Sequence, residues 1–256
     1  GASSGIGAEF ARQLAGNGIN LVLIARREHL LNDLGRDLSA TYGIDYRVLP
    51  LDLTETDFLQ KIDSATRDLE IGLVISNAGA GNPGEFLRID QPELMQVIRL
   101  NVISHMTIAH HFGRKLAKRG RGGLLLIAAM GASEGLPYMA NDAATKAYII
   151  SLAKGLHMEL EKHGVHITVV LPGPTDTPVI DQFGFDVESM PMKPMSVEQC
   201  VTEALVALRE NRTSHLTGRI NRLMIKLMPA SLIRKILGTM IAKGVEKRQQ
   251  TSGAIG

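Results

Sequence analysis

The stretch "GASSGIG", residues 1–7, carries glycines at positions 1, 5 and 7. Gly1 permits a tight turn, Gly5 allows backbone to come close to a pyrophosphate, and Gly7 permits close packing of a helix on a strand. The helix that begins here directs its free N–H groups at such phosphates. Three glycines alone are a weak signal, because any tight turn can use them. The rest of the chain has to supply the context.

Strand-like and helix-like segments alternate along the chain. Strands are expected at residues 19–25, 46–51, 71–76, 123–129, 165–172 and 214–217, and helices at 5–17, 28–42, 56–69, 91–118, 142–163 and 196–210. Such alternation implies parallel pairing through right-handed crossovers, and therefore a doubly wound, Rossmann-type sheet with helices on both faces. A glycine turn of this kind follows a buried central strand. We therefore expect a strand of about 5–6 residues before Gly1.

Composition favours a single α/β domain with a basic tail. The 256 residues are 45% hydrophobic and have a net charge of +2, which gives no indication of nucleic-acid binding. Eight basic residues and one acidic residue follow Gly218, so the tail is positive and the preceding body is negative. We expect a dinucleotide-binding domain over 1–218 and an amphipathic helical tail over 219–256. A basic tail can contact anionic lipid or an acidic partner.

The lone cysteine and the histidines predict neither a disulfide nor a metal site. Cys200 has no cysteine partner, which favours a reducing compartment and a cytoplasmic location, with membrane association through the tail left open. The histidines lack metal-ligand spacing, and most are expected to be surface or packing residues. The longest apolar run, residues 124–130, is too short to span a bilayer.

Four further motifs supply the context for the glycine turn. They are "ISNAG" at 75–79, Asn101 in "RLNV", Lys146, and "LPGPTDT" at 171–177. In this order and spacing, residues 1–218 resemble the short-chain dehydrogenase/reductase family. The resemblance implies a homo-dimer or homo-tetramer and a nicotinamide cofactor that borders both "ISNAG" and "LPGPTDT". The implied cofactor-binding residues are Gly1, Ser3, Ser4, Gly5, Ile6, Gly7, Arg26, Arg27, Asp52, Leu53, Asn77, Ala78, Gly79, Lys146, Pro172, Gly173 and Thr177.

The residues after the strand at 19–25 indicate which nicotinamide cofactor is used. NAD-binding proteins place an acidic residue there to hold the ribose 2′-hydroxyl. This chain has "IARRE", with Arg26 and Arg27 in place of an acid. An arginine can grip a 2′-phosphate with its bidentate fork. We therefore expect NADP(H), with Arg26 as the main contact and Arg27 as a secondary one, although two arginines can also simply begin a solvated helix.

Two of the four catalytic positions that the resemblance implies are replaced. The family uses a tyrosine as proton donor, a lysine four residues later, a serine thirteen residues before the tyrosine, and an asparagine on the long helix. Here Lys146 and Asn101 keep their positions. Asp142 stands at the tyrosine position and Ala129 at the serine position.

Asp142 is a poor replacement for tyrosine on this reasoning. The pKa of a free aspartic acid is about 3.9, against about 10 for tyrosine, and Lys146 nearby should lower it further. We expect Asp142 and Lys146 to form an i, i+4 ion pair. Tyr138 lies where the substrate pocket should open and is a weaker candidate for the missing acid. More often such a tyrosine only lines a pocket.

The segment "PVIDQFGFDVESMPMKPM", residues 178–195, stands where the family has its substrate lid. Its phenylalanines and methionines suit a lipophilic ligand. The tail resembles that of the branch that reduces long-chain 3-oxoacyl thioesters and steroids. Its helices can equally well simply cap the pocket or a subunit contact. The sequence therefore favours an NADP(H)-dependent oxidoreductase acting on a carbonyl or alcohol of a lipophilic molecule, with impaired proton transfer. The alternative is a catalytically silent NADP(H)-binding sensor, partner subunit or ligand carrier.

Overall fold

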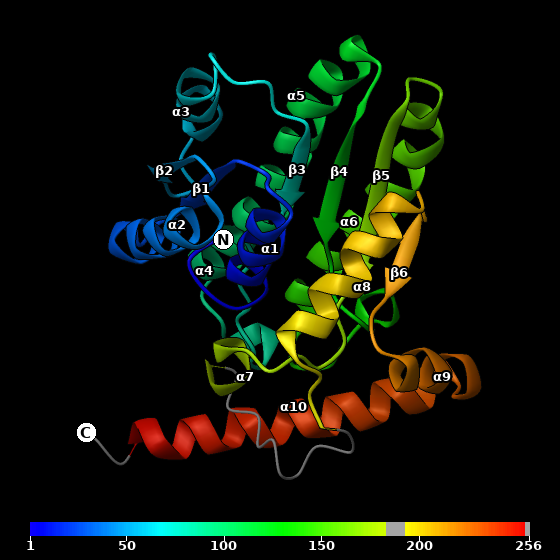
Figure 1. Ribbon diagram of the computed structural model, residues 1–256. Helices are drawn as coiled ribbons and strands as arrows, with labels where there is room; N and C mark the ends of the chain where they lie inside the picture. Colours follow the sequence, from blue (N-terminus) through cyan, green and yellow to red (C-terminus); the bar gives the residue numbers. More distant parts are fainter. Residues whose placement is uncertain (183–192, 254–256) are drawn as a thin grey trace.

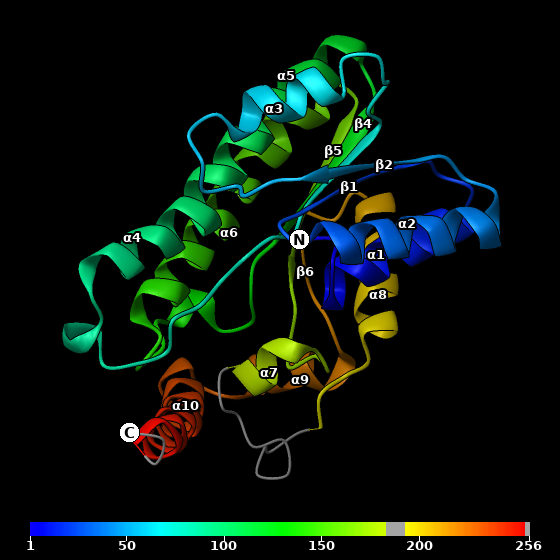
Figure 2. The same ribbon diagram turned by 90° about the vertical axis from the view of Figure 1, so that its left-hand side faces the viewer.

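The computed structural model describes residues 1–182 and 193–253. Most of the expected substrate lid at 178–195 therefore lies outside the described residues. The chain folds into one Rossmann-type domain, as the alternation of elements predicts (Figure 1). Its parallel strands carry helices on both faces, and two helices of the basic tail follow the last strand (Figure 2).

The first half of the chain follows the expected order closely. Its elements are α1 (Gly5–Gly16), β1 (Leu21–Ala25), α2 (Glu28–Tyr42), β2 (Tyr46–Pro50), α3 (Phe58–Ala65) and β3 (Leu73–Ser76). Gly43 ends α2 in the left-handed conformation, with φ of 70°, which only glycine adopts at little cost. Helix α3 is shorter than expected, because residues 66–69 form turns held by the Thr66 hydroxyl, which donates to the Ile62 carbonyl.

The second half departs from the expectation at its long helix. The single helix expected at 91–118 is α4 (Gln91–Ile98), a π-helical turn (Arg99–Ile103) and α5 (Ser104–Arg119). The remaining elements are the 3₁₀ turns at Phe86–Arg88 and Ala132–Glu134, β4 (Gly122–Ile127), α6 (Ala140–Glu161), β5 (Val165–Leu171), α7 (Pro178–Gln182), α8 (Val197–Arg209), β6 (Ser214–Leu216), α9 (Arg219–Leu227) and α10 (Ala230–Gly253). The π turn matters because Asn101 lies in its centre.

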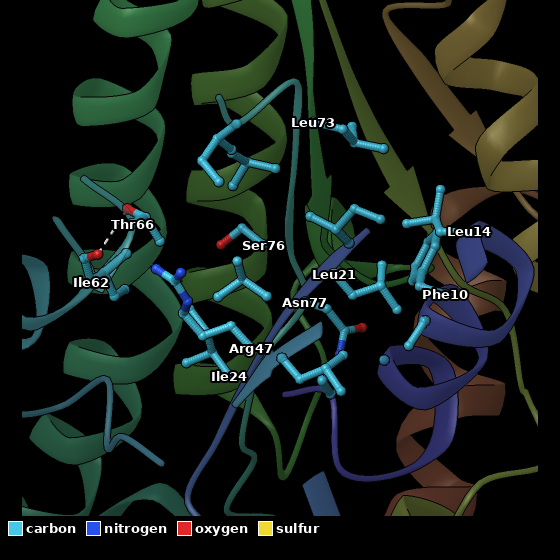
Figure 3. A pocket seen from close by; sticks show the side chains of 18 of the residues that line it. Phe10, Leu14, Leu21, Ile24, Arg47, Ile62, Thr66, Leu73, Ser76 and Asn77 are labelled. Carbon is cyan, nitrogen blue, oxygen red and sulfur yellow. Dashed lines mark hydrogen bonds between the residues drawn. The ribbon is translucent and has the colours of Figure 1, made fainter. Parts of the chain in front are cut away.

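The parallel strands form two separate sheets in the described residues. Strand β1 pairs with β2, and β3, β4, β5 and β6 pair in that order. No described strand lies between β1 and β3. A cavity of about 840 Å³ separates them, lined by Leu21 and Ile24 of β1, by Leu73 of β3, and by Phe10 and Leu14 of α1 (Figure 3). The two halves are joined on one side by packing of α1 against α8.

The core lies on both faces of the larger sheet. On one face, Phe112 and Leu116 of α5 and Ile149 of α6 pack on Leu124 and Leu126 of β4. On the other face, α1 and α8 cover alternate residues of the same strand: Phe10 and Val201 pack on Leu125 and Ile127. Near-continuous burial of β4 is typical of a parallel strand covered on both sides. This packing fixes the carboxyl ends of the strands, where the site residues lie.

Candidate functional site

The glycine turn meets two other motifs at the carboxyl ends of the strands. Gly5 has φ of +52°, and a Cβ at this position would lie 3.3 Å from Cγ2 of Thr177. A Cβ at Gly7 would lie 2.0 Å from the Gly1 carbonyl oxygen, which a side chain cannot tolerate. The Asn77 side-chain amide donates to the same oxygen over 3.4 Å. The structure thus brings the glycine turn, "ISNAG" and "LPGPTDT" together, as the sequence predicts.

Arg27, rather than Arg26, contacts the glycine turn. Its guanidinium donates to the Ser3 hydroxyl at 2.9 Å and to the Ser4 hydroxyl at 2.8 Å. Arg26 turns toward Asp52, with 3.9 Å between Nη1 and Oδ2. The two arginines therefore have different partners in the structure, because adjacent side chains at the start of a helix point in different directions, and the expected roles of Arg26 and Arg27 toward a 2′-phosphate stay a prediction. Both guanidinium groups remain exposed and can reach an anionic ligand.

Asn101 and Lys146 lie together beside Gly79. A Cβ at Gly79 would lie 2.9 Å from Nζ of Lys146 and 3.4 Å from Oδ1 of Asn101. Asn101 is fully buried in the π turn, where its side chain accepts from the Ala80 N–H at 3.0 Å and donates to the Ala80 carbonyl at 2.8 Å and to the Thr145 hydroxyl at 3.0 Å. Single π turns occur frequently at functional sites. This one fixes Asn101 between α6 and the "ISNAG" loop.

The expected ion pair between Asp142 and Lys146 is wrong. No ion pair within 4.0 Å joins these two residues, although the structure describes both. Asp142 instead accepts the backbone N–H of Asn82 at 3.0 Å. Lys146 donates to the Ile127 carbonyl at the end of β4, at 3.2 Å. The two side chains leave α6 in different directions, since Asp142 bonds to the loop that carries Asn82 and Lys146 bonds to the end of β4.

Burial shifts the pKa of the Asp142 carboxyl in the direction opposite to the one expected from the sequence. Burial raises the pKa of Asp142 above its ordinary value, and the Asn82 N–H and the charge on Lys146 only partly offset this. The prediction of a lowered pKa for Asp142 is therefore wrong. Burial likewise lowers the pKa of Lys146 to about 8, against the opposing effect of Asp142. A carboxyl with a raised pKa and an ammonium with a lowered pKa therefore stand one turn apart on α6.

Ala129 and Tyr138, the two other positions discussed as catalytic candidates, lie in segments next to α6. Ala129 follows the end of β4, two residues after the carbonyl that binds Lys146, and it offers no side-chain donor. Tyr138 has φ of 62°, which is rare for a large residue and indicates local strain. Its carbonyl accepts from the Gly84 N–H at 2.8 Å, and 37% of its surface is exposed. Tyr138 is thus held at the loop before α6.

The remaining predicted cofactor residues support the same edge of the sheet. Asp52 accepts from the backbone and hydroxyl of Thr54. The Pro172 carbonyl accepts from the Met130 N–H. A Cβ at Gly173 would overlap the Asn221 side chain, at 2.0 Å, so this position is fitted to the start of α9. Ile6 and Leu53 pack against the two faces of the core, and the Ala78 carbonyl accepts from His105.

Sequence reasoning missed three residues that hold the site. His105 is fully buried, its Nε2 bonds to the Ala78 carbonyl at 2.8 Å, and burial lowers its pKa to about 3, so the ring is neutral. Its position four residues after Asn101, on the same helix face, was the available signal. Thr145 bonds to Asn101 and Asn82 to Asp142, but no spacing in the sequence indicates either contact.

Two features are absent from the described part of the chain. No group of three or more histidine, cysteine, aspartate or glutamate side chains is placed to hold a metal ion. No helix there combines the length and apolar character needed to cross a membrane.

Comparison with known proteins assigns the family. The model of the short chain dehydrogenase family matches residues 1–186, and the chain therefore belongs to that family. The 7beta-hydroxysteroid dehydrogenase of Clostridium sardiniense is 28% identical over 88% of this chain and 86% of its own. The very-long-chain 3-oxoacyl-CoA reductase of Neurospora crassa is 32% identical over 67% of this chain, which spans about half (53%) of that protein.

A solved structure agrees with the fold. The short-chain dehydrogenase from Sphingobium yanoikuyae, determined in complex with NADPH, superimposes with a TM-score of 0.79 at 31% identity. The match covers 84% of this chain and 85% of the other.

Proposed function

We propose that this chain binds NADP(H) and acts on a carbonyl or alcohol of a lipophilic small molecule, with weak turnover by the family's usual route of proton transfer. The observation that carries the proposal is the group around α6. Lys146 and Asn101 stand together beside Gly79, whereas the tyrosine position holds Asp142, bonded to Asn82, and the serine position holds Ala129.

The glycine turn and its arginines support the cofactor. The close approaches at Gly5 and Gly7 leave a bare backbone cradle suited to a pyrophosphate. Arg27 already bonds to two hydroxyls of the turn, and Arg26 lies beside it without a closer partner than Asp52. Two exposed guanidinium groups at this place suit a 2′-phosphate. The bound cofactor would supply the hydride, and the relative from Sphingobium yanoikuyae binds NADPH.

The names of the relatives support the substrate class. They include dehydrogenases of hydroxysteroids and reductases of very-long-chain 3-oxoacyl-CoA. The apolar composition of residues 178–195 agrees with such a ligand. The steroid and the fatty-acyl chain share the chemistry that matters here, which is a reactive oxygen on an otherwise apolar body.

The residues at the reacting end explain why turnover would be weak. Ala129 cannot donate to a substrate oxygen, and removal of one such donor typically costs about 10²–10³ in rate. The Asp142 carboxyl is shorter than a tyrosine, and catalytic geometry tolerates little displacement. Burial raises the pKa of Asp142, so this group retains some capacity to hold a proton. That capacity supports residual, rather than absent, oxidoreduction.

One observation favours a second candidate function. Asp142 directs an oxygen to the Asn82 N–H, so its carboxylate supports the "ISNAG"–Asn82 loop as a structural acceptor. If Asp142 has only this structural role, the chain would be a catalytically silent NADP(H)-binding sensor, partner subunit or ligand carrier. Lys146 would then be retained because it holds the ribose.

Binding and turnover measured on one preparation separate these candidates. NADPH and NADH titrations should give tighter binding of NADPH. NADPH oxidation with a panel of steroid ketones and 3-oxoacyl thioesters should be slow, and Asp142→Asn should reduce it further. Binding without any oxidation favours the silent function. Rapid oxidation that Tyr138→Phe abolishes would contradict the proposal, because Tyr138 would then be the acid. Absence of NADPH binding would overturn the cofactor assignment.

A further inference from the structure

Helix α9 presents an apolar ridge to solvent. Ile220, Leu223 and Leu227 are 68%, 57% and 70% exposed, respectively. Their spacing of three and seven residues places them on one face of the helix. The helix lies at the edge of the molecule beyond β6, with α10 continuing along the same end of the domain (Figure 1). Three large apolar side chains in a row on a nine-residue helix are not an ordinary scatter of surface residues.

Positive charge flanks this ridge. Arg219 and Lys226 are exposed and, being seven residues apart, lie together along one side of the apolar face. Lys235 and Lys243 of α10 are exposed as well, and residues 219–245 contain no aspartate or glutamate. An apolar face bordered by cations is the pattern of a helix that lies in the interface of a bilayer with anionic headgroups.

The opposite side of α9 is fastened to the body. Asn221 is buried and donates to the Thr217 carbonyl at 2.8 Å. Arg222 donates to Glu203 at 2.7 Å and to the Leu216 carbonyl at 2.8 Å. Burial alone would raise the pKa of Glu203, but hydrogen bonds from Arg222, Gln199 and His215 outweigh it and lower the pKa to about 2. The outward apolar face is thus fixed by polar contacts on the inner face.

We propose that α9 docks on an anionic lipid surface, with Ile220, Leu223 and Leu227 entering the acyl boundary and Arg219 and Lys226 contacting the headgroups. A second copy of the chain is a weaker occupant, because a stable interface needs about 800 Å² from each partner and one convex ridge of three side chains offers much less. The cations also complement the lipid headgroups directly. The proposal is independent of turnover, so failure of the oxidoreductase assignment leaves it intact.

Vesicle flotation tests the proposal on the full chain. Binding to phosphatidylcholine vesicles with about 30% phosphatidylserine should exceed binding to pure phosphatidylcholine about tenfold or more, and about 0.5 M salt should weaken it. Ile220→Gln with Leu223→Gln and Leu227→Gln should lower vesicle binding about tenfold or more. Arg219→Gln with Lys226→Gln should lower binding to the phosphatidylserine vesicles by about fivefold per removed charge and leave binding to pure phosphatidylcholine unchanged.

A matched control and a second measurement keep the outcomes distinct. Met158→Gln on α6 removes an apolar side chain that is 79% exposed and should leave vesicle binding unchanged. Unchanged thermal unfolding and NADPH affinity would show that the ridge variant is folded. Equal binding of the ridge variant and the parent would overturn the proposal. So would sedimentation showing that the parent self-associates, does not bind vesicles, and becomes monomeric when the ridge is replaced.

Discussion

Asp142 and Lys146 stand one turn apart on α6 and yet bind to different parts of the backbone. The Asp142 carboxylate accepts the Asn82 N–H at 3.0 Å, and the Lys146 ammonium donates to the Ile127 carbonyl at 3.2 Å. Each side chain therefore fixes a separate wall of the site: Asp142 holds the loop after "ISNAG", and Lys146 holds the end of β4. The lysine is positioned by backbone rather than by its acidic neighbour.

Asp142→Asn should stabilise the protein at neutral pH. Burial raises the folded-state pKa of Asp142, so its favourable contribution exists below the unfolded pKa and is lost as pH rises through the folded pKa. An asparagine has no charge to bury, and its side-chain oxygen can still accept the Asn82 N–H, so the substitution removes this pH-dependent loss of stability. Urea unfolding of both forms at pH 7 and at about pH 4 checks this. A variant that is less stable at pH 7 by as much as at pH 4 would contradict it.

Ala129→Ser combined with Asp142→Tyr should create measurable carbonyl reduction. Asn101 and Lys146 lie together beside Gly79, so under the proposed assignment of Ala129 and Asp142 the two changes would supply a donor and an acid next to them. We expect a gain on the order of 10²-fold in NADPH oxidation over the parent chain. Each single change should do little, because groups of this kind act as a unit. A gain from either change alone that equals that of the pair would show that the site works differently.

Arg27→Ala should reduce the preference for NADPH over NADH at least as much as Arg26→Ala. Arg27 contacts both hydroxyls of the glycine turn, whereas Arg26 lies against Asp52. Loss of one bidentate guanidinium–phosphate contact costs about 1.5–3 kcal/mol, which is about tenfold or more in affinity. Titration of both cofactors into both variants measures the effect. A preference for NADPH that survives Arg27→Ala and disappears in Arg26→Ala would contradict this prediction and confirm the order expected from the sequence.

NADPH affinity should fall as pH rises above about 8. The folded pKa of Lys146 is lowered to about 8 by burial, so its positive charge is lost there in the free protein. If protonated Lys146 holds the ribose, NADPH binding above pH 8 must be accompanied by uptake of a proton. NADPH affinity then falls with each further pH unit. Calorimetric titration across pH 6 to 10 should show the break. Lys146→Arg should remove it, since arginine stays charged, and a break that persists in this variant would assign it to another group.

The order of strands and helices could be predicted from the sequence because the spacing of apolar residues differs between buried strands and amphipathic helices. Three features could not. The π turn at Arg99–Ile103 has i→i+5 hydrogen bonds in place of i→i+4, a difference of one residue within a continuous helical pattern, so apolar periodicity cannot separate it from α4 and α5. The contact of Arg27 with Ser3 and Ser4 depends on the direction in which its side chain leaves the start of α2. The raised pKa of Asp142 depends on burial by distant loops, whereas the i, i+4 spacing to Lys146 suggested only an ion pair.

The inner contacts of α9 have a consequence for the whole body. Asn221 and Arg222 hydrogen-bond to Thr217 and Glu203, so α9 is held in place against the domain and is not a flexible attachment. A surface that binds the apolar ridge of α9 would therefore fix the orientation of the whole domain relative to that surface. Helices α9 and α10 lie at the end of the domain where the strands terminate (Figure 1). A domain that docks through α9 would keep the carboxyl ends of its strands, and with them the candidate site, on the side that faces that surface.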